Sequence, residues 1–410
     1  MNILILCNKS PYPPQEGGPM AMNSMVTGLI EAGHNVKILA VNSEKYHISI
    51  DKIPADYKEK TRIELVDVDL RVKPWQAFKN LFSDKSYHVE RFISEDFKAK
   101  LISILKKEKF DVVQLEMIYM APYIETIRNH SKAVIVLRTH NIEHLIWDRI
   151  AKKTWFCLKR WYINHLVRTL RGYEFDVINK VDGIASITYR DAAFFRGITN
   201  VPVVDIPFGI NVDAFKPSFE IHEKPTFFHI GSMNWMPNEE AMKWLVSEIW
   251  DKVVKRNPKA EIHLAGRNMP KWLQNIKRKN LVVEGEVPDA KEFVASHDIA
   301  VVPLLSGSGM RIKIIEAMAM GKAVITTMVG AEGIQYSEYE NIIIADTAEK
   351  IVEAMVRIIG EPAEAERIGR NARALVENLY DNNKIINRLL LFYNELINEK
   401  QITILNEVEQ

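Results

Sequence analysis

The sequence predicts an α/β protein built from two doubly wound domains, each with a parallel sheet. From Ile3 onward, short apolar runs alternate with longer segments of helical periodicity. The chain has 410 residues, more than one ordinary hydrophobic core supports. Prolines and charged residues interrupt the apolar pattern at 209–223. We therefore expect domains at 1–208 and 209–382, followed by an amphipathic helix at 383–410.

Composition narrows the class of protein. Hydrophobic residues make up 47% of the chain and charged residues 26%, as in soluble globular proteins, and the net charge of +1 gives no argument for nucleic acid. Two cysteines exclude a disulfide framework and favour a reducing cytosol. The apolar start, Asn2 to Cys7, ends too early for a signal peptide, and no apolar run approaches the roughly 20 residues of a membrane helix. We expect a cytoplasmic protein whose membrane contact, if any, is peripheral.

The first half opens with a βαβ unit. A buried strand at 3–6 is followed by a loop with Gly17 and Gly18, a helix at 20–32 and a strand at 36–41. The loop lacks the Gly-x-Gly-x-x-Gly fingerprint, which disfavours a nicotinamide oxidoreductase. The glycine pair alone is compatible with a plain turn or with a loop that approaches a ligand.

His140 follows the strand predicted at 133–137, after earlier strands at 63–68 and 112–115. Ligands in open α/β sheets bind at the carboxyl ends of the strands, so His140 is a candidate for substrate contact. A structural hydrogen-bonding role remains the alternative. His144 lies at helical spacing from it, but no matched ligand set completes a zinc site, so we expect no metal.

Residues 152–171 are basic with interleaved aromatic residues. One interpretation is an amphipathic helix that touches an anionic membrane. The other is a long helix that packs its aromatic residues on the sheet and shows lysines to water. Further along, Asp191 is a candidate cap of the helix that follows a strand at 183–188.

The second half repeats the alternation of strands and helices. Gly231 follows a strand at 226–230, and a helix is expected over 239–255. Arg267 follows a strand at 261–265 and is a candidate cation. The remaining expected elements are strands at 203–208, 281–283, 299–304 and 323–327, and helices at 289–296, 348–359 and 363–379.

The segment from Ser306 to Lys322 combines a strand end, a glycine loop and a helix start. Such a helix start presents free N–H groups and a positive dipole end to an anion. Arg311 and Lys313 are poorly placed there for helix stability, which a bound phosphate would explain. Glu316 lies one turn further on, where it can accept hydrogen bonds from a ribose. A solvated charged turn is the alternative.

This segment resembles the donor site of the retaining glycosyltransferases of family 4, which have the GT-B fold of two facing Rossmann-like domains with a cleft between them. Lys313, the run Glu316 to Ala319, Gly321 and the pair Glu332-Gly333 match the family pattern. The family's first glutamate falls on Ser308, where this chain departs from the pattern.

The resemblance implies transfer of a sugar, of the hexosyl kind, from a nucleoside diphosphate to a hydroxyl acceptor with retained configuration. It implies that His140 contacts the sugar and that Arg311 and Lys313 stabilise the departing diphosphate, with no cofactor and no metal. The terminal helix would cross back to the first domain, although dimerisation would suit it equally. The donor nucleotide would be held by Gly17, Gly18, Gly231, Arg267, Ser308, Gly309, Met310 and Glu316.

A Gly-Ser-Met-x-Trp-x-Pro-Asn segment at 231–238 resembles one subset of the family. Ser232 and Pro237 stand where most members carry an Arg and a Lys on the diphosphate. The implied partners are a nucleoside-diphosphate sugar and a glycan or lipid-linked acceptor, with peripheral contact at the inner membrane face through 152–171. A noncatalytic sugar-nucleotide-binding subunit and a nonhydrolysing epimerase remain the alternatives.

Overall fold

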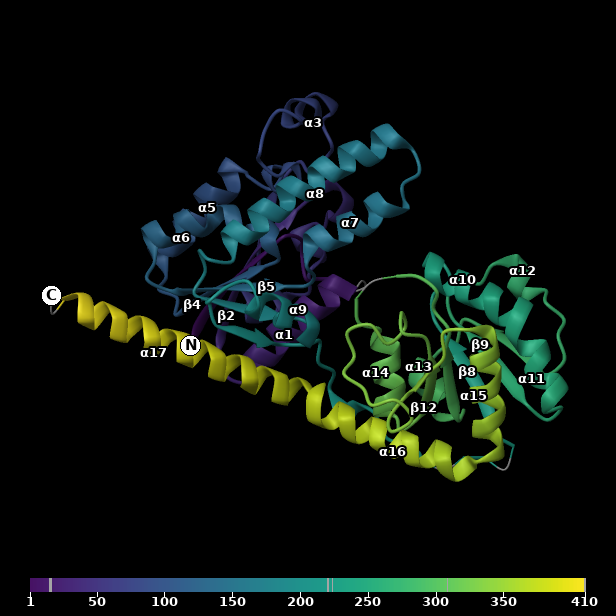
Figure 1. Cartoon of the computed structure of the whole chain (residues 1–410). Helices are drawn as coiled ribbons and strands as arrows, with labels where there is room; N and C mark the ends of the chain where they lie inside the picture. The colour runs from purple at the N-terminus through teal and green to yellow at the C-terminus, as the bar shows by residue number, and fades with distance from the viewer. Residues whose placement is uncertain (15–16, 220, 223, 308, 409–410) are drawn as a thin grey trace. The chain divides into compact units, whose positions relative to one another are not determined.

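The computed structural model describes residues 1–14, 17–219, 221–222, 224–307 and 309–408, with side chains up to residue 402. The chain divides into two compact units. Unit 1 contains Met1–Gly209 and Ile385–Gln410, and unit 2 contains Ile210–Lys384. Each is an α/β unit with a parallel sheet, as the sequence predicted (Figure 1).

Unit 1 is built on a seven-stranded parallel sheet in the order β3-β2-β1-β4-β5-β6-β7. The order reverses direction at β1, which is the arrangement of doubly wound sheets. The strands are β1 Asn2–Cys7, β2 Asn35–Asn42, β3 Glu64–Asp67, β4 Val112–Glu116, β5 Val134–Thr139, β6 Gly183–Ser186 and β7 Val203–Asp205.

The side chains of β1 show how this sheet carries a core on both faces. Successive residues of a strand point to opposite faces. Leu4 and Leu6 therefore join the cluster that contains Phe97 of helix α5 (Glu95–Lys107), whereas Ile3 and Ile5 join the cluster on the other face. All four are fully buried, which explains why β1 is a continuous apolar run.

Helix α17 (Asn382–Val408) belongs to unit 1 from residue 385 onward, although it ends the described part of the chain (Figure 1). Its apolar residues Ile385, Leu389, Phe392 and Leu396 lie in the same core cluster as Ile3 and Ile5 of β1.

None of the helices described is long and apolar enough to cross a membrane. The α-helices of unit 1 are α1 Gly17–Glu31, α2 Ala55–Thr61, α3 Pro74–Asn80, α4 Tyr87–Glu90, α5 Glu95–Lys107, α6 Ile124–His130, α7 Glu143–Lys153, α8 Cys157–Val177, α9 Tyr189–Arg196 and α17 Asn382–Val408.

Unit 2 is built on a six-stranded parallel sheet in the order β10-β9-β8-β11-β12-β13. The strands are β8 Thr226–Ile230, β9 Glu261–Ala265, β10 Leu281–Gly285, β11 Ile299–Val302, β12 Ala323–Thr326 and β13 Ile343–Ile344. The helices are α10 Met236–Trp244, a π-helical turn at Leu245–Ile249, α11 Trp250–Arg256, α12 Lys271–Gln274, α13 Ala290–Ala295, α14 Ile312–Ala319, α15 Ala348–Gly360 and α16 Pro362–Leu379.

Three local expectations were wrong. The basic segment 152–171 is not one helix, because α7 ends at Lys153 and α8 begins at Cys157. Helix α1 begins at Gly17 rather than at residue 20, so the glycine pair is its first turn. The cap of α9 is Thr188, whose hydroxyl accepts from the backbone N–H of Asp191 at 3.0 Å, which places Asp191 inside the helix.

Tyr393 links α17 to the middle of the unit 1 sheet. Its hydroxyl bonds to Oε1 of Gln114, and Nε2 of Gln114 donates to Oε1 of Glu116 at 2.6 Å. All three residues are fully buried. The hydroxyl is therefore the group that satisfies a buried amide oxygen.

We expect Tyr393→Phe to lower the free energy of unfolding of unit 1 by about 1–3 kcal/mol, because it leaves the Gln114 amide oxygen buried without its donor. Urea unfolding followed by tryptophan fluorescence measures the change. Tyr339→Phe, at an exposed tyrosine of unit 2, is the control. Equal stability of Tyr393→Phe and the parent chain would contradict the role given to this bond.

Candidate functional site

The loops after β8 and β9 approach each other at the carboxyl edge of the unit 2 sheet. Gly266 has a φ of +144°, and a Cβ atom on it would lie 1.8 Å from the carbonyl oxygen of Gly231. A side chain on Gly231 would in turn meet Nδ2 of Asn238 at 2.8 Å and Nζ of Lys313 at 3.0 Å. The bare backbone of Gly231 is therefore needed for Lys313 to reach this position.

The Lys313 amine is held by two acceptors that come from other parts of unit 2. Its Nζ donates to Oδ1 of Asn238 at 2.7 Å and lies 3.4 Å from Nε2 of His229. Asn238 is itself oriented, because its Nδ2 donates to the backbone oxygen of Ser232 at 2.8 Å. The helix start of α14 is thereby tied to the loop after β8.

The protonation state of the Lys313 amine depends on its surroundings. Burial lowers its pKa to about 7, with Arg311 as a second cause. Burial and then Lys313 lower the pKa of His229 well below its ordinary value, so this ring is neutral. Because Nδ1 of His229 lies 2.8 Å from the carbonyl oxygen of Val301, which can only accept, Nδ1 carries the proton and Nε2 faces Lys313 as an acceptor. The sequence suggested a fully charged Lys313. The structure instead holds an amine close to its midpoint of protonation at neutral pH, which an added anion would protonate.

Arg311 is folded back on its own loop. Its Nη1 donates to the carbonyl oxygen of Gly309, and its guanidinium lies 5.3 Å from the ring centroid of Trp235. Gly307 allows this, since a Cβ atom there would lie 2.7 Å from Nη2 of Arg311. Arg311 is 6% exposed and is the N-cap residue of α14. Burial lowers its pKa.

The other predicted donor-site residues of unit 2 differ in their surroundings. Glu316 is half-buried on α14, and burial raises the pKa of its carboxyl group. Gly309 has a φ of +83° and an open position for a side chain. Arg267 is exposed and follows Gly266 directly. Met310 is half-buried in the loop before α14, and Ser308 lies outside the described residues.

A cavity of about 290 Å³ lies beside Gly266, at the carboxyl ends of β9 and β10. Cavities near this size hold small ligands, and the position is where open α/β sheets bind them. Its lining residues are Gly266, Asn268, Met269, Gln274, Val283, Glu284, Gly285 and Glu286.

In unit 1, His140 lies one residue beyond β5 and bonds to a buried carboxylate. Its Nε2 lies 2.6 Å from Oε2 of Glu116, and Nη1 of Arg138 donates to the same oxygen at 3.2 Å. Glu116 and Arg138 are 0% and 1% exposed. Burial opposes ionisation of Glu116, but Arg138 and His140 outweigh it and lower the pKa. The imidazole is thus oriented by a carboxylate at the sheet edge where substrates bind.

Gly17 and Gly18 lie in unit 1 at the start of α1. A Cβ atom on Gly18 would lie 3.2 Å from Nζ of Lys9, and Gly17 has open space around it. Lys9 follows β1 and is one of the charges that lower the pKa of His140. The structure therefore brings Gly18, Lys9 and His140 to one edge of the unit 1 sheet.

A second buried acidic cluster lies next to this edge, where α7 begins. Glu143 accepts from the hydroxyl of Tyr119 at 2.8 Å, and its backbone N–H donates to Oε1 of Glu174 at 3.1 Å. Glu174 also bonds to Nδ1 of His144. Burial raises the pKa of Glu143 to about 7, with Glu174 as a further cause. Within the described part of the chain, no group of three or more His, Cys, Asp or Glu residues is arranged to hold a metal.

Sequence reasoning did not assign a role to Lys9, Glu116, Arg138, His229 or Asn238. A usable signal existed for two of them. Glu116 ends β4 and Lys9 follows β1, and both positions lie at carboxyl ends of parallel strands. His229 had none, because it stands inside an apolar strand and its partner is 84 residues away.

Comparison with known proteins bears on both units. Residues 224–361 match the family model described as "Glycosyl transferases group 1", so this part of unit 2 is a glycosyltransferase domain. A protein of Klebsiella pneumoniae described as an uncharacterized 44.6 kDa protein in the cps region is 21% identical over 401 residues, which cover 94% of this chain and 98% of that protein.

Solved structures show the fold. A sucrose-phosphate synthase from Thermosynechococcus elongatus superposes with a TM-score of 0.66 at 15% identity, covering 97% of this chain and 100% of the other. HepE from Anabaena, solved in complex with UDP, gives a TM-score of 0.64 at 12% identity over 96% of this chain and 100% of HepE. TarM gives a TM-score of 0.63 at 13% identity, with 96% and 99% covered. The prediction of the GT-B fold is confirmed.

We expect Glu143→Gln to change how stability depends on pH. In the unfolded chain this carboxyl group ionises near its ordinary pKa of 4.5, whereas in the folded chain it keeps its proton up to about 7. The free energy of unfolding therefore falls as pH rises between these values and is level above them. Without this ionisable group, the variant is more stable than the parent chain above pH 7, by at most about 3 kcal/mol. Urea unfolding at a series of pH values measures it.

Glu125→Gln, at an exposed glutamate of α6, serves as the control for the loss of one carboxylate from unit 1. A Glu143→Gln curve parallel to that of the parent chain between pH 4.5 and 7 would show that this residue does not carry the pH dependence.

Proposed function

We propose that this glycosyltransferase moves a sugar from a nucleoside-diphosphate sugar to a hydroxyl group of a glycan or lipid-linked acceptor, with retained anomeric configuration. The observation that carries the proposal is the Lys313 amine at the start of α14. It is oriented by Asn238 and His229 beside the bare backbone of Gly231, and its pKa is lowered to about 7. A diphosphate placed there would gain a full positive charge in a position that is already organised.

In the proposed reaction, the bond between the anomeric carbon and the diphosphate oxygen breaks, and a bond from that carbon to the acceptor oxygen forms. The acceptor proton passes to the departing diphosphate. Negative charge therefore grows on the diphosphate as the donor breaks, and Lys313, Arg311 and the N-terminus of α14 would stabilise it. Glu316 would hold the ribose, and the cavity beside Gly266 offers room for the nucleoside. In unit 1, His140 would contact the donor sugar.

Three similar proteins support the class of donor and the type of pathway. HepE was solved in complex with UDP and with UDP-glucose, which makes a uridine nucleotide the first donor to test. The Klebsiella relative is described as lying in a cps region, and WaaG, of the same fold, as a glycosyltransferase involved in lipopolysaccharide biosynthesis. We infer a role in assembling a surface polysaccharide or glycolipid, at the cytoplasmic face of the membrane, with residues 152–171 as the segment that meets it.

The proposal is tested first by thermal unfolding with a panel of nucleoside diphosphates and their sugars. A ligand present at about 100 times its Kd stabilises the folded chain by about 2.7 kcal/mol. We expect a raised Tm with one base, lost in Lys313→Ala and reduced in Glu316→Gln. Arg256→Ala, on the exposed end of α11, is the control. NMR of the product formed with a hydroxyl acceptor then reads its anomeric configuration.

If no nucleotide at millimolar concentration raised the Tm of a folded sample, the proposed donor site would be ruled out. A shift without turnover by the chain alone would favour the noncatalytic binding subunit. Conversion of the donor to its epimer without acceptor would favour the epimerase.

Donor binding should also take up a proton at Lys313. In the free chain its pKa is about 7, and a bound diphosphate raises it. Affinity for a nucleoside-diphosphate sugar is therefore level below pH 7 and falls above it, by at most about tenfold per pH unit. Calorimetry in buffers with different heats of ionisation counts the protons. Uptake should approach one proton at pH 8 and vanish in Lys313→Arg, and its absence in the parent chain would contradict this role.

A further inference from the structure

Large apolar side chains of unit 1 are exposed to solvent in two segments of the chain. Trp155 is 91% exposed and Phe82 is 82% exposed, values that are rare for aromatic residues. Trp75 and Phe78 of α3 lie in the first segment with Phe82, and Phe156 and Trp161 lie in the second with Trp155. We call these six residues the aromatic surface. Exposed apolar groups gathered in this way mark a place of interaction.

The two segments belong to one region of unit 1. Nε2 of His165 on α8 lies 3.1 Å from the backbone oxygen of Asn80 at the end of α3. Arg168, one turn further along α8, lies 3.7 Å from Asp84. Trp161 precedes His165 by one helical turn. The middle of α8 therefore contacts the C-terminal end of α3, and Figure 1 shows both helices in the same region of unit 1.

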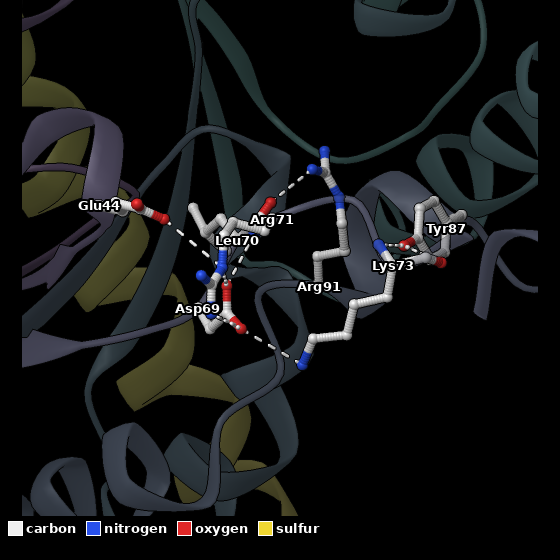
Figure 2. A network of polar contacts seen from close by, with 7 residues as sticks. All are labelled: Glu44, Asp69, Leu70, Arg71, Lys73, Tyr87 and Arg91. Carbon is white, nitrogen blue, oxygen red and sulfur yellow. Dashed lines mark hydrogen bonds and ion pairs between the residues drawn. The ribbon is translucent and has the colours of Figure 1, made fainter. Parts of the chain in front are cut away.

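Polar contacts hold the chain that leads into α3 (Figure 2). Nη1 of Arg91 donates to the backbone oxygen of Leu70 at 2.8 Å, and the backbone N–H of Lys73 donates to the hydroxyl of Tyr87 at 3.0 Å. The carboxylate of Asp69 accepts from Nε of Arg71 at 2.9 Å and lies 3.4 Å from Nζ of Lys73. The entry to α3 is thus fixed in place.

The far end of α3 is also held, while its aromatic face is open. Asn80 is 4% exposed, and its Nδ2 donates to the backbone oxygen of Lys85 at 2.8 Å. Within α3, Trp75 stacks on Phe78 at 5.8 Å between ring centroids, and Phe78 meets Phe82, two residues beyond the helix, edge-on at 5.7 Å. The fold therefore presents these rings on an anchored helix.

The charge of both segments is of one sign. Residues 149–171 contain three lysines and four arginines, and residues 71–83 contain two lysines and one arginine, while neither range contains an aspartate or glutamate. Lys153, Lys159 and Arg160 are exposed beside the aromatic rings. Basic and aromatic side chains together suit an interface with anionic headgroups, where rings enter the headgroup region and cations meet phosphates.

We propose that the aromatic surface docks unit 1 on an anionic lipid bilayer. Helix α3 and the turn between α7 and α8 enter the headgroup region together, and the exposed side chains of Lys153, Lys159 and Arg160 bind lipid phosphates. Leu158, which is 67% exposed at the same turn, favours lipid over single-stranded nucleic acid, because bases stack on rings but gain little from aliphatic groups. The proposal extends the inferred work at the membrane face but does not depend on catalysis, so the two can fail separately.

The test is flotation of the purified full chain with vesicles of phosphatidylcholine, with or without phosphatidylglycerol. We expect binding to the anionic vesicles and a blue shift of tryptophan fluorescence. Trp155→Ala with Trp161→Ala, and separately Trp75→Ala with Phe78→Ala, should each weaken binding at least about tenfold. Lys159→Gln with Arg160→Gln should weaken it by about fivefold per charge, and salt should mimic this loss.

Matched controls are Leu391→Ala, an exposed apolar residue of α17, and Lys106→Gln with Lys107→Gln on α5. Both should bind as the parent chain does. Absence of binding to anionic vesicles, or binding that survives the α3 and α8 variants, would overturn the proposal. Tight binding of an oligonucleotide without lipid binding, or a dimer that the aromatic variants dissociate, would assign the surface to another partner. Retained Tm shifts with nucleotide in all variants would show that the donor site is intact.

Discussion

A buried carboxylate, Glu116, is the group around which unit 1 has to be arranged. Removing an ion from water is costly unless neighbouring groups replace its hydrogen bonds. Here Arg138, His140 and Gln114 do so, and they come from β4, β5 and the residue beyond it. The same demand reaches α17, because Gln114 in turn requires the hydroxyl of Tyr393. The need to stabilise the buried Glu116 carboxylate thus orients the imidazole of His140, a candidate for substrate binding. Through Gln114, it also holds α17, which is distant in sequence, against the sheet.

In unit 2 the main structural constraint is the close approach of two backbone segments. Gly231 and Gly266 let two loops touch, and the space that they leave is taken by the Lys313 amine and the Asn238 amide. A lysine in such a place is held by acceptors that are neutral, since Asn238 has no charge and His229 has lost its own. Neutral acceptors orient the amine without cancelling its charge, which leaves its field available to an incoming anion. A carboxylate in their place would have formed an ion pair and satisfied the amine beforehand.

The fold was accessible from the sequence because strands buried on both faces are continuous apolar runs, as Ile3 to Leu6 shows. The candidate donor site was accessible in part, through the spacing of Gly309, Lys313 and Glu316 around a helix start. What sequence reasoning missed depends on long-range partners. His229 resembles any core residue until Lys313 is placed against it, and Glu116 becomes meaningful only beside Arg138. The break between α7 and α8 was missed because helical periodicity continues through it.

The membership of α17 in unit 1 has a consequence for the order in which the protein is made. Unit 2 is one continuous stretch, residues 210–384, and every strand of its sheet has been synthesised before α17 leaves the ribosome. Unit 1 lacks Leu389, Phe392 and Tyr393 until unit 2 has been synthesised, so the core face of β1 that these residues cover stays open meanwhile. Domains usually fold in the order of synthesis. In this chain the unit that begins first is completed last, and its exposed sheet face is the surface that a chaperone would meet on the nascent protein.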